Sequence, residues 1–280
     1  MPGIHLTDGR YLAWREWGAP DGRPVIYCPG AGMTGLLPFG QAEAGDLGLR
    51  IIAVDRPGLG HSSADPGKSL DSWTHDVAQL VDQLGLGAVL TLGFSQGAPF
   101  ALALAAGGLA DAVAIVSGQD ELALPELTCQ LPDPVAAMVR RAAQAPRALE
   151  AEIAATATPG WLWQMIETFS GPADRAFYAA EGFAPLYRAA LDEGFRQGAA
   201  GYARDTVLAM APWSFRAEAL GCPVGLWFGL ADTSPVHSPD FGATLAARLP
   251  AAHLTQLAGE GSAILWTRAG EILGALARAA

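Results

Sequence analysis

The 280-residue chain has few charged residues and few cysteines, and each shortage excludes a class of protein. Charged side chains make up 16% of the chain, whereas hydrophobic ones make up 51%. So much apolar surface can be buried that extended disorder is excluded. The cysteines Cys28, Cys129 and Cys222 are too few and too scattered for a disulfide framework or a zinc site. We interpret them as small core residues.

Basic residues are also scarce. Lys and Arg total 17 against 28 Asp and Glu, which gives a net charge of −11. Phosphate groups would be repelled, so we expect no nucleic-acid partner and no docking on an anionic membrane. No apolar run reaches the ~18 residues of a spanning helix, and the first residues lack the pattern of a secretory signal. We therefore expect a cytoplasmic protein.

Histidine is sparse as well, with only five in the chain. They are His5, His61, His75, His237 and His253. This small set limits which side chains can act as a general base.

Short apolar runs alternate with amphipathic segments over most of the sequence. The runs at 24–28, 50–55, 88–94, 112–117, 223–228 and 252–257 are typical of buried strands, and the segments at 70–84, 98–106, 242–249 and 267–279 of helices. Continuous apolar strands separated by helices predict an α/β protein with a parallel sheet covered on both faces. Residues 11–17 fit an antiparallel strand at the sheet edge.

Strand-like runs disappear between residues 124 and 212. This segment contains successive helical patterns separated by prolines. The sequence therefore predicts a core formed by residues 1–123 and 213–280, with an all-helical insertion at 124–212.

The most informative local pattern is Gly93-Phe94-Ser95-Gln96-Gly97. This G-x-S-x-G sequence lies between a predicted buried strand and an Ala-rich helix, which is the setting of a nucleophile elbow. The flanking glycines permit a tight turn, so the Ser95 hydroxyl would project from the end of the sheet.

The chain resembles the α/β-hydrolase fold superfamily over nearly its whole length. The resemblance rests on Trp17-Gly18, on Pro29-Gly30-Ala31-Gly32, on the segment 55–62 (DRPGLGHS), on the elbow, on Trp213 and on Gly229-Leu230-Ala231-Asp232. It implies a mostly parallel eight-stranded sheet flanked by helices, with residues 124–212 as a helical cap.

The resemblance also implies roles for single residues. Ser95 would be the nucleophile, and the backbone N–H groups of Gln96 and Ala31 would form the oxyanion hole. Asp232 matches the position of the triad acid. Asp120, which follows the strand at 112–117, is the alternative acid.

The triad histidine is missing from its usual place. The loop after the last strand reads Gly259-Glu260-Gly261-Ser262, and Ser262 occupies the histidine position. His61 is the nearest substitute, whereas we expect His237 to begin or flank a surface helix. Without a base, turnover should fall by about 10⁶-fold. The sequence therefore predicts a severely impaired hydrolase.

Two functions remain open at this point. The first is a serine hydrolase acting on a small hydrophobic ester, lactone or thioester. The second is a non-hydrolytic small-molecule binder, or a lyase-like enzyme, on the same scaffold. Trp161, Trp163, Met165 and Phe169 in the insertion are candidate pocket residues. We expect no cofactor and no metal, and the sequence does not distinguish a monomer from a homodimer.

Overall fold

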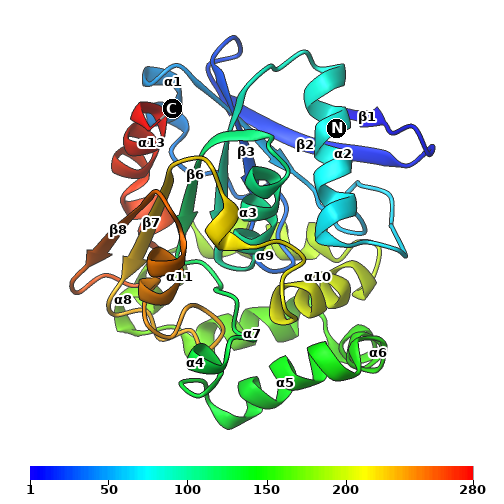
Figure 1. The fold of residues 1–280 in the computed structure, drawn as a ribbon, viewed down its shortest axis with the longest axis vertical. Coiled ribbons are helices and arrows are strands. Elements are labelled where there is room, and N and C mark those ends of the chain that lie inside the picture. The colour runs from blue at the N-terminus through cyan, green and yellow to red at the C-terminus, as the bar shows by residue number, and fades with distance from the viewer. Residues whose placement is uncertain (280) are drawn as a thin grey trace.

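The computed structural model, which describes residues 1–279, is built around one eight-stranded sheet (Figure 1). The strands are β1 (Gly3–His5), β2 (Tyr11–Gly18), β3 (Arg23–Cys28), β4 (Leu49–Val54), β5 (Val89–Phe94), β6 (Ala110–Val116), β7 (Val224–Gly229) and β8 (Ala252–Leu257). Their order in the sheet is β1-β2-β4-β3-β5-β6-β7-β8. The pairings β1–β2 and β2–β4 are antiparallel, and all the others are parallel.

This arrangement confirms the fold class expected from the sequence. One detail differs. The strand expected at the edge, β2, lies between β1 and β4, because the first residues of the chain add the short strand β1 outside it. With only three residues, β1 is too short to produce an alternating pattern that sequence reading can detect.

Successive side chains of the central strands point to opposite faces of the sheet, and each face has its own hydrophobic core. On β3 and β4, Tyr27 and Ile51 belong to the core shared with α1 (Gln41–Asp46) and α13 (Ala269–Arg278). Ile26 and Ile52 belong to the opposite core, shared with α2 (Leu70–Gln83), α3 (Ala98–Ala106) and α11 (Ala243–Arg248). Both faces are therefore covered, as parallel strands require.

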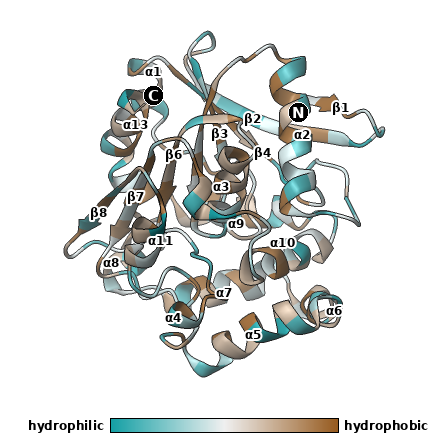
Figure 2. Cartoon of the chain, in the orientation of Figure 1, coloured by the Kyte–Doolittle hydropathy of each residue, from teal (hydrophilic) through white to brown (hydrophobic). Residues whose placement is uncertain are grey.

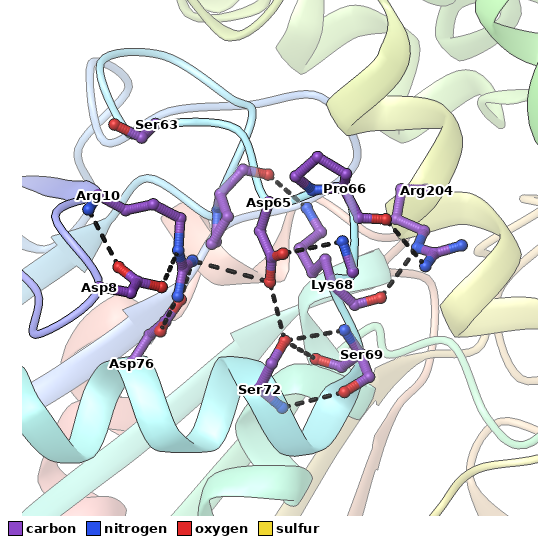
Figure 3. Close-up of polar contacts among 12 residues, drawn as sticks. Asp8, Arg10, Ser63, Asp65, Pro66, Lys68, Ser69, Ser72, Asp76 and Arg204 are labelled. Atoms are coloured by element: carbon purple, nitrogen blue, oxygen red, sulfur yellow. Dashed lines mark hydrogen bonds and ion pairs between the residues drawn. The ribbon is translucent and has the colours of Figure 1, made fainter.

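Helix α2 begins at a capping box, in which Ser69 is the N-cap and Ser72 the reciprocal partner. Figure 2 shows hydrophilic and hydrophobic residues alternating along α2, because one face packs on the sheet. The loop before α2 is held on both sides (Figure 3). Asp65 accepts a hydrogen bond from Ser72 Oγ at 3.1 Å, and Arg204 donates to the Lys68 carbonyl at 2.8 Å.

Between β6 and β7 the chain forms helices only, and Figure 1 shows them, green to yellow, gathered at one end of the sheet. They are α4 (Pro125–Thr128), α5 (Asp133–Gln144), α6 (Pro146–Thr156), α7 (Pro159–Phe169), α8 (Pro172–Tyr178), α9 (Ala184–Gly194) and α10 (Ala200–Met210). All of these helices except α10 have a proline in their first turn. The missing N–H of proline costs nothing there, because the first N–H groups of a helix have no partner within the helix. The short α12 (Ile264–Thr267) precedes α13.

The helical segment is joined to the rest of the molecule through buried charges. Asp205 of α10 pairs with Arg56, at 2.7 Å, and with Lys68, at 2.5 Å, and all three side chains are almost fully buried. The domain boundaries at 124 and 212 stay a prediction. Within residues 1–279, no helix has the length and apolar character that crossing a membrane requires.

The interpretation of the cysteines was right for one of the three. Cys28 is buried in β3, where burial raises the pKa of its thiol to about 12. Cys129 is exposed and Cys222 is half-buried. Both lie outside the sheet, in segments where the sequence carries no strand pattern.

Candidate active site

Ser95 follows β5 directly and adopts a left-handed backbone conformation, with φ of 51°. Such a conformation is strained for a residue other than glycine. A Cβ at position 93 would lie 2.8 Å from Ala98 Cα, and one at position 97 would lie 2.0 Å from the Cys28 carbonyl oxygen. Both glycines are therefore required for the turn that brings Ser95 to the end of the sheet.

The Ser95 hydroxyl is hydrogen-bonded to an imidazole. Ser95 Oγ lies 2.8 Å from His237 Nε2. On the other side of the ring, His237 Nδ1 lies 2.6 Å from Asp232 Oδ2. Because an ionised carboxylate can only accept, Nδ1 of the neutral ring carries the proton and Nε2 is left as an acceptor facing Ser95.

The expectation that no imidazole reaches Ser95 is therefore wrong. The inference of an impaired enzyme rested on that absence and loses its basis. The expectation that His237 begins or flanks a surface helix is also wrong. His237 lies five residues after Asp232 in the loop between β7 and α11, and only 8% of its surface is exposed.

Sequence reading missed His237 because the family's usual place for the histidine is after the last strand, where this chain has Ser262. A loop without secondary structure has no periodicity from which the direction of a side chain can be predicted. The available signal was proximity: Asp232 and His237 share one short loop at the carboxyl end of β7, the edge at which β5 delivers Ser95.

Ser262 has a structural environment of its own. Its backbone N–H and its hydroxyl both donate to Asp174 Oδ2, at 2.8 and 3.0 Å, and its hydroxyl lies 2.8 Å from Tyr178 Oη. The backbone N–H of Ala263 donates to Asp174 Oδ1 at 2.8 Å. Position 262 thus attaches α8 to the loop after β8, and its hydroxyl is occupied by these contacts.

The loop after β3, which contains Ala31, is held by Arg56. Arg56 donates to the carbonyl oxygens of Pro29 and Gly30, at 2.5 and 3.0 Å. The Gly30 carbonyl and the Ala31 N–H belong to one planar peptide unit and point in opposite directions. Fixing that carbonyl therefore fixes the direction of the Ala31 N–H.

The structure separates the two candidate acids. Asp232 contacts His237, whereas the contacts of Asp120 are the backbone N–H of Glu121, at 2.7 Å, and the hydroxyl of Ser238, at 3.1 Å. Burial raises the pKa of Asp120 to about 6.

His61, the expected substitute base, is engaged elsewhere. Its Nδ1 lies 2.7 Å from Arg196 Nη1 and its Nε2 lies 3.2 Å from Glu193 Oε1. Because a guanidinium only donates, Nδ1 accepts and Nε2 donates to the carboxylate. His61 thus links the loop after β4 to the end of α9.

The four candidate pocket residues of α7 do not share one environment. Trp161 and Phe169 are 40% and 45% exposed, Met165 is half-buried and Trp163 is buried. The Trp163 ring packs against Tyr187 and lies beneath the Arg188 guanidinium. Their role in binding stays a prediction.

Another aromatic side chain contacts the residue that precedes the nucleophile. Trp266 of α12 packs edge-on against Phe94, the residue before Ser95, with ring centroids 5.0 Å apart. Trp266 also packs on Phe183 and Tyr178 of the helical segment. Sequence reading assigned no role to Trp266.

In the described part of the chain, no three His, Cys, Asp or Glu side chains gather in a geometry suited to an ion.

The chain matches a family model and several known proteins. The model described as alpha/beta hydrolase fold matches residues 23–181, more than half of the chain. A non-heme chloroperoxidase of Streptomyces lividans is 30% identical over 106 residues, which are 35% of this chain and 36% of the relative. The aligned stretch thus spans about a third of that curated relative.

Solved structures match over almost the full length. A thermophilic esterase from Thermogutta terrifontis is 18% identical with a TM-score of 0.73, covering 99% of this chain and 96% of the esterase. A bromoperoxidase from Bacillus anthracis is 19% identical with a TM-score of 0.75, covering 96% of both chains. At such identities the likeness establishes the fold alone.

Proposed function

Because the chain belongs to the alpha/beta hydrolase fold family, we propose that it is a serine hydrolase cleaving small hydrophobic carboxylic esters, lactones or thioesters. The observation that carries the proposal is the continuous chain of contacts from Ser95 Oγ to His237 Nε2 and from His237 Nδ1 to Asp232. A serine hydroxyl is a poor nucleophile until a neighbouring base takes its proton.

In the first half of the reaction Ser95 Oγ attacks the carbonyl carbon of the ester, and His237 Nε2 takes the hydroxyl proton. Asp232 holds the ring and stabilises the imidazolium. As the tetrahedral intermediate collapses, His237 gives that proton to the departing alcohol or thiol. Ser95 is left acylated.

In the second half water takes the place of the alcohol. His237 Nε2 removes a proton from the water, whose oxygen attacks the acyl carbon. Collapse of this intermediate breaks the bond to Ser95 Oγ, and His237 returns the proton to the serine. The carboxylic acid leaves and the enzyme is regenerated.

In each half the carbonyl oxygen becomes negative, and we assign its stabilisation to the backbone N–H groups of Gln96 and Ala31. One oxyanion donor contributes about 10²–10³-fold to turnover in serine hydrolases. The two bonds from Arg56 to the carbonyls of Pro29 and Gly30 support Ala31 as a donor, because they hold its peptide in one orientation.

The preference for a hydrophobic substrate rests on the surroundings of Ser95. Phe94 and Trp266 lie on the side of the loop after β8. On the side of the loop after β3, a Cβ at Gly32 would come within 3.0 Å of Phe195 and Leu162 side chains. Apolar groups from the helical segment therefore lie close to the proposed oxyanion loop.

The test is hydrolysis of p-nitrophenyl acetate and butyrate by the wild type, Ser95→Ala, His237→Ala and Asp232→Asn. We expect turnover in the wild type and a fall of about 10⁴-fold or more in kcat for each variant. His253→Ala is the matched control, because His253 is exposed on β8 and should be silent. Full activity in His237→Ala would refute the assigned base.

The alternative of a non-hydrolytic binder or lyase-like enzyme was founded on the missing base. No other feature of the site favours it. An inactive wild type that nevertheless binds small hydrophobic esters would restore it.

A further inference from the structure

The base and the nucleophile reach each other from two different segments of the chain. Ser95 is the first residue of a single 3-10 turn, Ser95–Gly97, whereas His237 lies in a loop without regular secondary structure. Ser95 is placed by the elbow. His237 lies in the segment 230–242, which connects β7 to α11. A displacement of about 1 Å between reacting groups can cost about 10²-fold in rate. Some part of the molecule must therefore hold the segment 230–242 against the elbow.

The tripeptide Gly118-Gln119-Asp120, which follows β6, contacts both sides. The backbone N–H of Gln119 donates to the carbonyl oxygen of Ser95 itself, at 3.0 Å. The Gly118 carbonyl accepts from the N–H of Ser238, the residue after His237, at 3.0 Å. One short stretch of backbone thus binds the nucleophile and the immediate neighbour of the base.

A side-chain contact reinforces this link. The Ser238 hydroxyl lies 3.1 Å from Asp120 Oδ2, and the same hydroxyl accepts a hydrogen bond from the Gly242 N–H at 2.9 Å. Ser238 is 4% exposed and Asp120 is fully buried. Hydrogen bonds of a carboxylate that is screened from water are stronger than those at the surface.

We propose that Asp120 is a positioning residue, whose carboxylate holds Ser238 and thereby sets the place of His237 relative to Ser95. This inference rests on the proposed function, because it requires His237 to be the base. It gives Asp120 a role different from that of the triad acid, since the carboxylate acts through the neighbour of the histidine. The turn after β6 is thus needed to hold the base, because the base lies in the segment after β7.

Asp240 is the competing partner. Its Oδ1 lies 2.9 Å from Ser238 Oγ, while its Oδ2 accepts from the N–H and the hydroxyl of Thr244 in α11. The serine has one hydroxyl proton to share between the two carboxylates. Substitutions at positions 120 and 240 therefore distinguish two roles for the Ser238 contacts. In one role they orient His237, and in the other they only stabilise the beginning of α11.

The experiment is a double-mutant cycle of Asp120→Ala and Ser238→Ala, with kcat and KM measured on p-nitrophenyl acetate. We expect each single variant to lower kcat by about 10- to 100-fold with KM within about twofold. The double variant should be no worse than the single ones, because both remove the same contact. Asp120→Asn keeps an oxygen acceptor and should recover most of the wild-type kcat.

Several outcomes would overturn the proposal. They are a wild-type kcat in Asp120→Ala, losses that multiply in the double variant, or a loss that appears in Asp240→Asn and not in Asp120→Ala. Near-ultraviolet circular dichroism checks folding. If Asp120→Ala does not fold, Ser238→Ala and Ser238→Cys carry the test, with a normal kcat in Ser238→Ala as the contradicting result.

Failure of the proposed function would look different. In that case Ser95→Ala and His237→Ala would leave ester hydrolysis unchanged. Failure of the positioning role alone leaves those two variants inactive, while Asp120→Ala and Ser238→Ala keep the wild-type kcat.

Discussion

Among single residues, Arg56 shows how a buried charge can hold a loop of the proposed active site in one conformation. Its guanidinium is balanced by Asp205 and binds two consecutive carbonyls of the loop after β3. The planar fork of arginine suits such a double contact, whereas a lysine ammonium supplies a single point charge. Its position in the sequence, between Asp55 and Pro57, carries no sign of this role.

Replacing Arg56 with lysine should therefore keep the charge that Asp205 requires and lose one of the two carbonyl contacts. We expect Arg56→Lys to lower kcat by about 10- to 100-fold, with a smaller change in KM, because the oxyanion forms only during the reaction. Steady-state kinetics and the affinity of a boronic acid that mimics the tetrahedral intermediate are the two measurements. Unchanged boronate affinity would contradict this role.

Elements with a periodic sequence were predictable, and the loops between them were not. Helix α3 and strand β8 were predicted with their observed bounds. Helix α3 is a continuous apolar, Ala-rich run between Gly97 and Gly107, and β8 is a short run that begins soon after Pro250. The elbow was placed correctly because its turn depends on Gly93 and Gly97. His237 was misplaced because the direction of its ring depends on contacts within the folded molecule, among them those with Ser95 and Asp232.

The attachment of α8 to the loop after β8 gives a prediction about Ser262. Restoring the family pattern with Ser262→His should not raise kcat. It should lower the free energy of unfolding by about 1–3 kcal/mol, because the larger ring displaces a hydroxyl that is 6% exposed and bonded to Asp174. Ester hydrolysis and urea denaturation measure the two effects. A tenfold gain in kcat would show that position 262 can still act as the base.

Over the whole molecule, acidic groups outnumber basic ones, and some of the carboxyls are buried. Burial raises the pKa of Asp55 to about 7, against an ordinary value of 3.8, while the backbone N–H of His61 and the nearby Arg15 oppose that shift and Glu193 adds to it. The native state therefore keeps this proton to a higher pH than the unfolded chain does. The contribution is stabilising below about pH 4 and is lost as the pH rises toward 7.

Asp55→Asn should remove this dependence on pH. As the pH rises from 4 to 8, the wild type should lose up to about 4 kcal/mol of unfolding free energy that the variant does not lose. The difference in unfolding free energy, variant minus wild type, should therefore increase by that amount. Urea denaturation across that range is the measurement, with Asp21→Asn as the control, because Asp21 is exposed. Parallel curves for Asp55→Asn and the wild type would rule out the raised pKa.

The short distance in sequence between Asp232 and His237 affects how the pair could be transferred between proteins by recombination or loop grafting. When the three side chains of a triad come from three loops, exchange of one loop transfers only one of them. The two side chains that remain no longer form a complete triad. Here the proposed acid and base occupy one contiguous segment of six residues, from Asp232 to His237. Exchange of that segment would carry the whole proton-transfer pair at once, provided that the recipient supplies a turn after β6 to receive it.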